Sequence, residues 1–539
     1  MAQADRMTAR DLPTPARPTA LDRLIAWLDP VAGLRRQQAR QFSAFLGGYT
    51  GASHSRRTLA GWQTLLGSAD KDTLYDLPML RQRSRDLVRN HPIATGALQT
   101  NVTRVVGTGL VLQSRVHREL LGLSEEEASR WQRRTEQEFA LWAGSESCDL
   151  TRTLDFYGLQ ALVFRSTLES GDCFALLPSV ERRGTPYRLT VQVIEADRVS
   201  NPAGRADTPE LAAGIERDPQ GAPLAYHVCS RHPGDYLAAA NRWTRVPAFG
   251  ARTGRRTCLH LVEQLRPGQS RGVPYLAPVI EPLRQLGQYT EAELTAAIVA
   301  GFFAVFVKSD AGEGLSPFES ATTGAAPAED KTAESWDGSL SPGLVADLAK
   351  GQSIETANPM RPNSSFDPFC LAVLRQVGVA LGLPFEVLIK HFTASYSAAR
   401  AALLEAWAFF KMRRAWLAGR FCQPVYASWM EEAVSLGRIA APGFFDDPLK
   451  RWAYLASQWV GDGPGAIDPL KEVQAADKRI DIGITTRSEE TLAYDGGDWE
   501  TRHLQAAKEH RLREAAGLLK PPVSAPRNET REEPSDEPS

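Results

Sequence analysis

Two kinds of hydrophobic spacing along the chain predict a fold that mixes helices and strands. Apolar residues recur every three or four positions in residues 80–106 and again in residues 124–168, which is typical of amphipathic helices. Ser124 followed by Glu127 is a capping box that opens the second region. Short apolar runs bounded by Gly, Pro and Asp then indicate strands, at residues 173–177, 189–194, 225–229 and 258–262. We therefore expect a strand-rich portion between helical ones.

The second half of the chain returns to helical spacing. A long helix is predicted after Pro274, and a second over residues 369–381, where Gly382 and Pro384 end it. Residues 312–337 contain almost no large apolar side chain and predict a loose loop, followed by a compact segment at 344–354. An apolar helix is expected from Ala399 past Trp416, and the last twenty residues, rich in Pro and Glu, are expected to be disordered.

Composition narrows the class of protein. The 539 residues are enough for roughly three or four domains. Lys and Arg number 62 and Asp and Glu 64, so no global basic excess indicates a nucleic-acid-binding protein, and any contact with a polyanion must be local. Six scattered cysteines favour reduced thiols. No secretory signal and no segment of about 20 apolar residues is visible, so we expect a soluble protein without a membrane partner.

Two motifs suggest chemistry, and each has a simpler explanation. Residues 268–272 match G-x-S-x-G around Ser270, the nucleophile motif of α/β hydrolases, but Pro267 and Pro274 interrupt the strand and helix that the motif requires. A surface loop is the favoured interpretation. Cys229 and His260, with His227, His232 and Cys258, supply zinc-ligand atoms, but without the tight paired spacing of zinc sites. We expect no metal and no cofactor, and no phosphate-binding loop is present.

Two polar segments are candidates for contact with partners. Arg81, Arg83, Arg85 and Arg89 form a basic run, which is either a solvated helix face or a contact for an acidic partner or a phosphate. Residues 390–397, between two apolar helices, contain a lysine, a histidine and two aromatic residues. This composition is typical of a loop that projects from a rigid scaffold into water.

Several motifs, taken in order, resemble the lambda-type portal proteins of tailed bacteriophages. The resemblance runs from about residue 83 to residue 518, and Ser270 falls inside one of its motifs, which explains that motif without catalysis. The stretches that carry it are residues 84–92, 106–110, 131–142, 171–172, 194–198, 266–274, 382–384, 396–402 and 468–472.

The resemblance implies an α+β portal fold assembled as a cyclic ring, typically of twelve copies. It has a mixed α/β wing, a stem of two helices, an α/β clip inserted between them, and a mostly helical crown. Carried onto this sequence, the parts are an N-terminal arm at 1–45, the wing at 46–273, stem helices at 274–300 and 365–385, the clip at 301–364, a tunnel loop at 386–398, wing closure and crown at 399–519, and a disordered tail at 520–539.

The resemblance also implies a structural protein and not an enzyme. The ring would sit at one vertex of the capsid in the virion, after assembly in the host cytoplasm, and would be the passive channel for DNA packaging and ejection. Its partners would be further copies of itself, double-stranded DNA bound without sequence specificity, the terminase large subunit, the major capsid and scaffold proteins, and head-tail connector or adaptor proteins. The DNA-facing residues would be Lys390, His391, Phe392, Thr393 and Tyr396. The alternative function is a serine hydrolase that uses Ser270.

Overall fold

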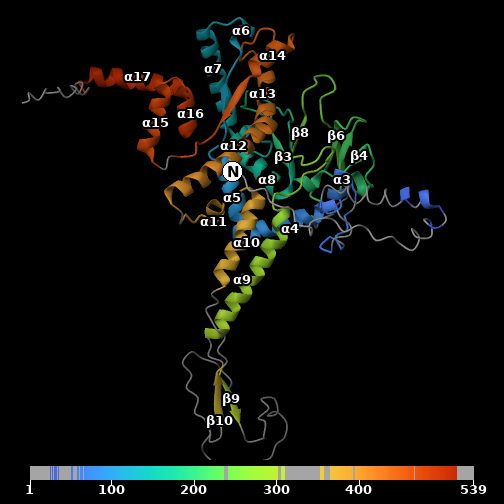
Figure 1. Cartoon of the computed structure of the whole chain (residues 1–539). Coiled ribbons are helices and arrows are strands. Elements are labelled where there is room, and N and C mark those ends of the chain that lie inside the picture. Colours follow the sequence, from blue (N-terminus) through green and yellow to red (C-terminus); the bar gives the residue numbers. More distant parts are fainter. Residues whose placement is uncertain are drawn as a thin grey trace, which may run out of the picture. The chain divides into compact units, whose positions relative to one another are not determined.

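The structure is a computed structural model of the chain (Figure 1). It describes residues 66–235, 241–301, 305–309, 352–356, 365–392, 395–465 and 468–518, with isolated residues between 25 and 64. The chain divides into two compact units, Met1–Ser68 and Ala69–Ser539. The elements from α3 (Ala69–Thr73) onwards belong to the second unit.

The helices of the first half follow the predicted spacing. Pro92 starts α5 and holds the preceding His91 in an extended conformation, so one apolar stretch becomes two helices. The capping box is confirmed, because the Ser124 side chain accepts from Glu127 N and the Glu127 side chain accepts from Ser124 N. The helices are α4 (Leu77–Asn90), α5 (Pro92–Val105), α6 (Arg118–Leu121), α7 (Glu125–Ala143) and α8 (Phe156–Ser170).

All four predicted strand runs contain strands, in two antiparallel sheets. In the three-stranded sheet, β2 (Asp172–Leu176) lies between β3 (Gln192–Ile194) and β8 (Cys258–Val262). The four-stranded sheet has the order β4 (Leu211–Ala212), β5 (Ile215–Arg217), β6 (Pro223–Cys229) and β7 (Trp243–Pro247). The sequence patterns did not predict two further pairs, β1 (Val111–Ser114) with β11 (Ser457–Val460) and β9 (Val305–Ser309) with β10 (Gln352–Thr356).

The second half is mostly helical. The predicted helix after Pro274 begins as a 3₁₀ turn, η5 (Ala277–Val279), and continues as α9 (Ile280–Gly301). The predicted start of the apolar helix at Ala399 is wrong by one turn, because α12 begins at Tyr396. The predicted loop at 312–337 lies outside the described residues. The other helices are α10 (Phe366–Leu381), α11 (Phe385–Ile389), α12 (Tyr396–Leu417), the π-helical η6 (Ala418–Cys422), α13 (Gln423–Ser435), α14 (Pro448–Leu455), α15 (Pro469–Asp481), α16 (Arg487–Asp495) and α17 (Trp499–Ala515).

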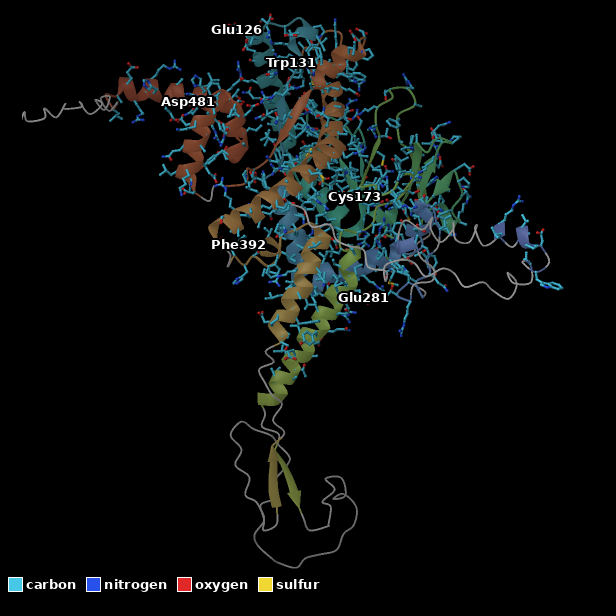
Figure 2. All side chains as sticks on the ribbon, viewed as in Figure 1. Glu126, Trp131, Cys173, Glu281, Phe392 and Asp481 are labelled. Atoms are coloured by element: carbon cyan, nitrogen blue, oxygen red, sulfur yellow. The ribbon has the colours of Figure 1, made fainter. Side chains whose placement is uncertain are left out.

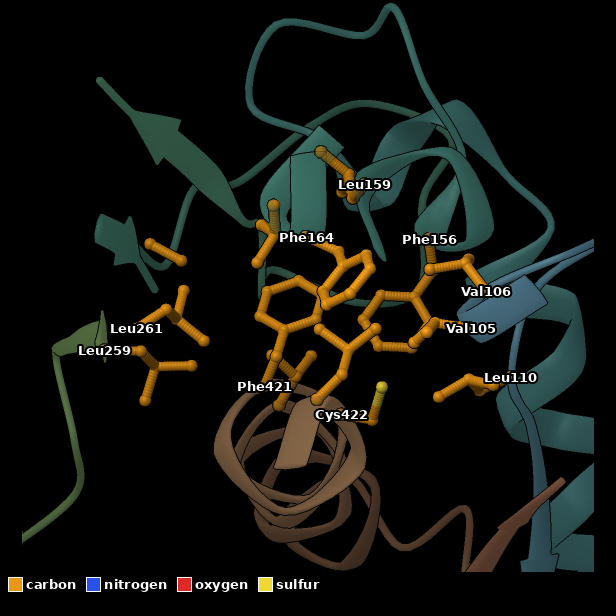
Figure 3. Close-up of a cluster of buried hydrophobic side chains, with 14 of the residues drawn as sticks. Val105, Val106, Leu110, Phe156, Leu159, Phe164, Leu259, Leu261, Phe421 and Cys422 are labelled. Atoms are coloured by element: carbon orange, nitrogen blue, oxygen red, sulfur yellow. The ribbon is translucent and has the colours of Figure 1, made fainter. Parts of the chain in front are cut away.

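The main core is built by α5, α7, α8, α12, η6 and α13. Phe139 of α7 is the centre of an aromatic group, with ring centroids 5.7 Å from Phe156 and 5.1 Å from Trp429 in edge-to-face geometry. Phe156 stacks in turn on Phe421 of η6 (Figure 3). A smaller core lies between the two sheets around Phe174 and Tyr226. Helices and strands both contribute to the main core, and the expected mixed α and β composition is confirmed.

The thiols match the expectation of reduced cysteines. All six cysteines are free, and five of them are buried, including Cys173 (Figure 2). Among the described residues, no helix combines the length and the apolar character needed to cross a membrane.

Candidate functional site

Asp172 is the centre of a buried ionic cluster where β2 meets the loop before α9. Its side chain is fully buried and accepts from Arg271 Nε at 2.6 Å and from Arg271 Nη2 at 3.2 Å. Arg81 of α4 donates to the same carboxylate at 2.7 Å, and His260 of β8 lies 3.1 Å from it. Burial opposes ionisation of Asp172, but the charges of Arg271 and Arg81 outweigh it and hold the pKa of this carboxyl well below its usual range.

Arg271 connects this cluster to the loop that follows β3. Its guanidinium, buried with the rest of the side chain, donates to the carbonyl oxygens of Ala196 at 2.6 Å, Val199 at 2.8 Å and Ala213 at 2.9 Å. It also lies over the ring of Phe174, with 5.1 Å to the centroid. The five N–H groups of Arg271 therefore all donate inside the protein, and its charge is paired with Asp172, as a buried guanidinium requires.

Glycines allow the backbone to close beside these charges. A Cβ atom on Gly272 would lie 1.9 Å from the carbonyl oxygen of Gly171, and one on Gly171 would lie 2.3 Å from the carbonyl oxygen of Gly272. Gly171 also has a φ of 91°. The two backbones cross at a distance that only glycine permits, which places Asp172 and Arg271 side by side.

The basic run of α4 divides into two internal and two exposed arginines. Arg81 is buried, donates from Nε to Ser170 O at 2.9 Å, and its pKa is lowered to about 10, chiefly by burial. Arg85 pairs with Asp197 and with Glu195, the latter at 3.1 Å. The carboxylates that bind these two arginines therefore belong to the chain itself. Arg83 and Arg89 are exposed, so contact with an external acidic partner or phosphate stays a prediction for them.

Ser270 lies in a loop between a strand and a helix, as expected, but the expected surface position holds only for residues 263–268, and residues 269–272 are buried. Its side chain is 1% exposed, its backbone N–H donates to Asp70 Oδ1 at 2.6 Å, and its hydroxyl donates to the second oxygen of Asp70. The neighbouring Gln269 and Arg271 are equally buried. Because the hydroxyl is buried and bonded to a carboxylate instead of a histidine, the geometry does not support a nucleophilic serine.

The histidines among the suggested zinc ligands have other partners. His260 binds Asp172, His227 lies 2.6 Å from Glu216, and Cys229 is buried in β6. Among the described residues, one group of three places possible metal-ligand atoms within 4.8 Å of one another, namely Glu195, Asp197 and His232. Arg85 already pairs with both of these carboxylates, and a cation beside that guanidinium would be repelled.

Three of the predicted tunnel-loop residues are described, and all are exposed. Lys390 ends α11 with a left-handed φ of 56°, and His391 and Phe392 follow it. Phe392 keeps 49% of its surface exposed (Figure 2). Thr393 lies outside the described residues, as does the side chain of Tyr396, whose backbone begins α12.

Sequence reasoning missed the ionic cluster. Asp172 and Arg271 both belong to motifs that carry the family resemblance, residues 171–172 and 266–274. No local sequence pattern indicates that two residues 99 positions apart form a pair. The available signal was a charged residue at the start of an otherwise apolar strand, since buried charges require partners.

Comparison with known proteins assigns the family. A family model described as "Phage portal protein, lambda family" matches residues 55–414. Portal protein B of Escherichia phage lambda is 28% identical over 521 residues, covering 92% of this chain and 96% of the relative. The portal protein of Escherichia phage N15 is 28% identical over 509 residues, covering 90% and 93%.

Solved structures from gene transfer agent particles also match. A chain from the virion of a native particle covers 70% of this chain and 92% of its own length, with 15% identity and a TM-score of 0.37. A chain from the neck of a native particle, computed with C12 symmetry, covers 76% and 93%, with 14% identity and a TM-score of 0.39. Since the family model spans well over half of the sequence, the chain belongs to the lambda family of phage portal proteins.

Proposed function

We propose that this chain is the subunit of a portal ring at one capsid vertex, through which DNA is packaged and ejected. The observation that carries the proposal is the match of residues 55–414 to the lambda portal family. The order of the described elements supports it: the long helix α9 is followed by the paired strands β9 and β10 and then by the return helix α10 (Figure 1). Tyr289 of α9 packs on Phe366 and Phe369 of α10, at 5.5 and 5.1 Å between ring centroids.

We assign the parts of the chain accordingly. Residues 46–273 form the wing, α9 and α10 the stem, the segment with β9 and β10 the clip, and residues 399–519 the wing closure and crown. The Asp172 cluster then stands between wing and first stem helix. A buried, fully compensated cluster is suited to keep that junction rigid while DNA moves past it.

Within the ring, the tunnel loop at 386–398 faces the DNA through Lys390, His391, Phe392, Thr393 and Tyr396. Cyclic symmetry repeats each weak contact around the channel, so one lysine per chain becomes a belt of positive charge. The near-neutral balance of 62 basic and 64 acidic residues limits phosphate neutralisation, which allows DNA to move without being held tightly. Such contacts carry no sequence information.

The further partners follow from this role. The ring is a structural virion component, assembled in the host cytoplasm, that docks the terminase large subunit, the major capsid and scaffold proteins, and head-tail connector or adaptor proteins. It acts without catalysis, cofactor or metal. The exposed Arg83 and Arg89 are available for an acidic partner or a phosphate.

The test is the mass and shape of the purified full-length chain, measured by light scattering and negative-stain microscopy. We expect a ring of about twelve subunits with a central hole. Particles no larger than a dimer at every salt and protein concentration, and also in the presence of capsid and scaffold proteins, would contradict the proposal.

A further inference from the structure

A hollow of about 380 Å³ lies beside the tunnel loop, between α5, α11 and α12. One side is polar and comes from the last turns of α5 together with Lys390. The other side is apolar and comes largely from α12. The lining residues are Gln99, Thr100, Thr103, Arg104, Val387, Lys390, Phe392, Leu403, Ala406, Trp407, Phe410 and Pro464.

The charged side chains that line this hollow are all positive. Its lining includes two cations, Lys390 and Arg104, and no carboxylate. Both cations are exposed, and neither forms an ion pair with any residue that the structure describes. A concave site with two uncompensated cations attracts an anion.

The positions of these groups are held by the fold. Arg414 of α12 donates to the carbonyl oxygens of Arg104 and Val105 at 2.9 and 3.0 Å, which fastens the end of α5 to α12. Gln99 donates to the Thr103 hydroxyl at 3.4 Å and accepts from Arg165 at 3.3 Å. Because the Thr103 oxygen accepts that bond, its hydroxyl hydrogen is available to a ligand.

The shape and chemistry fit one repeating unit of a nucleic-acid backbone. Cations and hydroxyl donors bind a phosphodiester group. The sugar next to it can pack on an apolar surface such as the half-exposed ring of Phe392. We propose that the hollow binds a phosphodiester group of the DNA in the channel, with Arg104 and Lys390 as counter-charges and Thr103 as a donor. This inference rests on the proposed function and adds α5 to the DNA-contacting surface, which the tunnel-loop assignment did not include.

The experiment uses the full-length ring and two single variants, Arg104→Gln and Lys390→Gln. Affinity for a fluorescein-labelled duplex of about 30 base pairs is measured by anisotropy between 50 and 200 mM salt. The matched control is Arg188→Gln, which removes an exposed arginine that pairs with Glu181. Ring assembly by microscopy and the thermal unfolding midpoint are measured for every variant, so that loss of binding is separated from loss of structure.

We expect Arg104→Gln to weaken binding about 3- to 10-fold at 100 mM salt and to reduce the slope of log K against log salt by about 1. A·T-rich and G·C-rich duplexes should be affected equally, because a phosphate contact does not read bases. The control should stay within about twofold.

Three results would overturn the inference, and they are distinguishable. If Lys390→Gln weakens binding and Arg104→Gln does not, the hollow is not a phosphate site while the proposed function stands. If Arg104→Gln weakens binding of a poly-glutamate peptide but not of DNA, the hollow binds an acidic protein segment. If the wild-type chain forms no ring and binds no duplex, the proposed function fails and the inference fails with it.

Discussion

Arg271 donates to both carboxylate oxygens of Asp172, at 2.6 and 3.2 Å, and both side chains are buried. The second guanidinium of the cluster, from Arg81, comes from a different part of the chain and binds the same carboxylate. One aspartate thus ties α4, β2 and the loop that leads into α9. The wing and the first stem helix meet here in the proposed ring. Substitutions in this cluster should therefore lower the stability of the whole protein.

Asp172→Asn should destabilise the protein strongly. The amide leaves the buried guanidinium of Arg271 without a negative charge and leaves Arg81 with only Asp197, at 3.6 Å, which costs about 3–5 kcal/mol in the free energy of unfolding. Chemical denaturation at pH 7 measures this difference. The control Glu181→Gln removes an exposed carboxylate that pairs with Arg188, and should change stability by about 0.5 kcal/mol or less.

The effect of Asp172→Asn should also depend on pH. The folded-state pKa of Asp172 is below its unfolded value, so its contribution is present above about pH 4 and is lost as the pH falls further. The difference between wild type and variant should therefore shrink when denaturation is repeated in acid. An equal difference at pH 3 and pH 7 would show that the charge of Asp172 is not what stabilises the cluster.

Gly272→Ala should destabilise the protein, or prevent its folding, for a steric reason. The new Cβ would lie 1.9 Å from a backbone oxygen of Gly171, and neither backbone has a flexible side chain that could move away. The matched control is Gly96→Ala in α5, where nothing lies within 4 Å of the new Cβ. That variant should be neutral or more stable by about 0.5–1 kcal/mol, because alanine favours helices. Soluble yield and the thermal unfolding midpoint compare the two, and equal midpoints would contradict the close backbone crossing.

Glu136→Gln should stabilise the protein at alkaline pH. Glu136 accepts from Ser114 N at 2.7 Å, and burial, with Asp498 and Glu500 nearby, raises its pKa to about 7 despite that bond and Arg115. The folded state keeps this proton between about pH 4.5 and 7 while the unfolded chain releases it, so stability falls across that window. Glutamine keeps the acceptor without the charge.

The thermal unfolding midpoint of Glu136→Gln, measured at pH 5 and pH 8, checks this prediction. We expect little change in the midpoint at pH 5. At pH 8 we expect a higher midpoint, which corresponds to a gain of about 1–3 kcal/mol in the free energy of unfolding. Glu126→Gln, on the exposed start of the same helix α7, is the control and should change stability by about 0.5 kcal/mol or less (Figure 2). A variant that loses stability at both pH values would mean that Glu136 is held as an anion.

The double variant Lys390→Glu plus His391→Glu should assemble normally but impair DNA packaging or retention. Both side chains are exposed, so the substitution removes no packing, while each subunit of the ring turns a positive loop into a negative one. Ring formation is followed by microscopy and packaged DNA by nuclease protection. His117→Glu plus Arg118→Glu, an exposed pair at the start of α6, is the control. Normal packaging by the loop variant would remove these residues from the DNA-facing surface.

The sequence by itself determined most of the helices and the family. Local signals are read within a few residues: the capping box at Ser124 and Glu127, the proline break at Pro92, and the glycine stop at Gly382 all lie where the structure has them. The order of short motifs carried the resemblance, which the family match confirms. Spacing could not predict the β1–β11 pair, because its strands are more than 300 residues apart in the chain.

Only the tertiary structure decided what the charged residues do. The run of arginines on α4 looks uniform in sequence, yet Arg81 and Arg85 bind internal carboxylates while Arg83 and Arg89 stay in water. In the same way, the motif around Ser270 is typical of a nucleophile, but Ser270 is buried and bonded to Asp70. Arg104 becomes a candidate for DNA contact because α11 and α12 form a hollow beside it. The physical reason is that a charge is stabilised by its partners and its exposure to water. The partners of Arg81 and Ser270 lie about 90 and 200 positions away in the sequence. Sequence periodicity carries no information about such distant pairs.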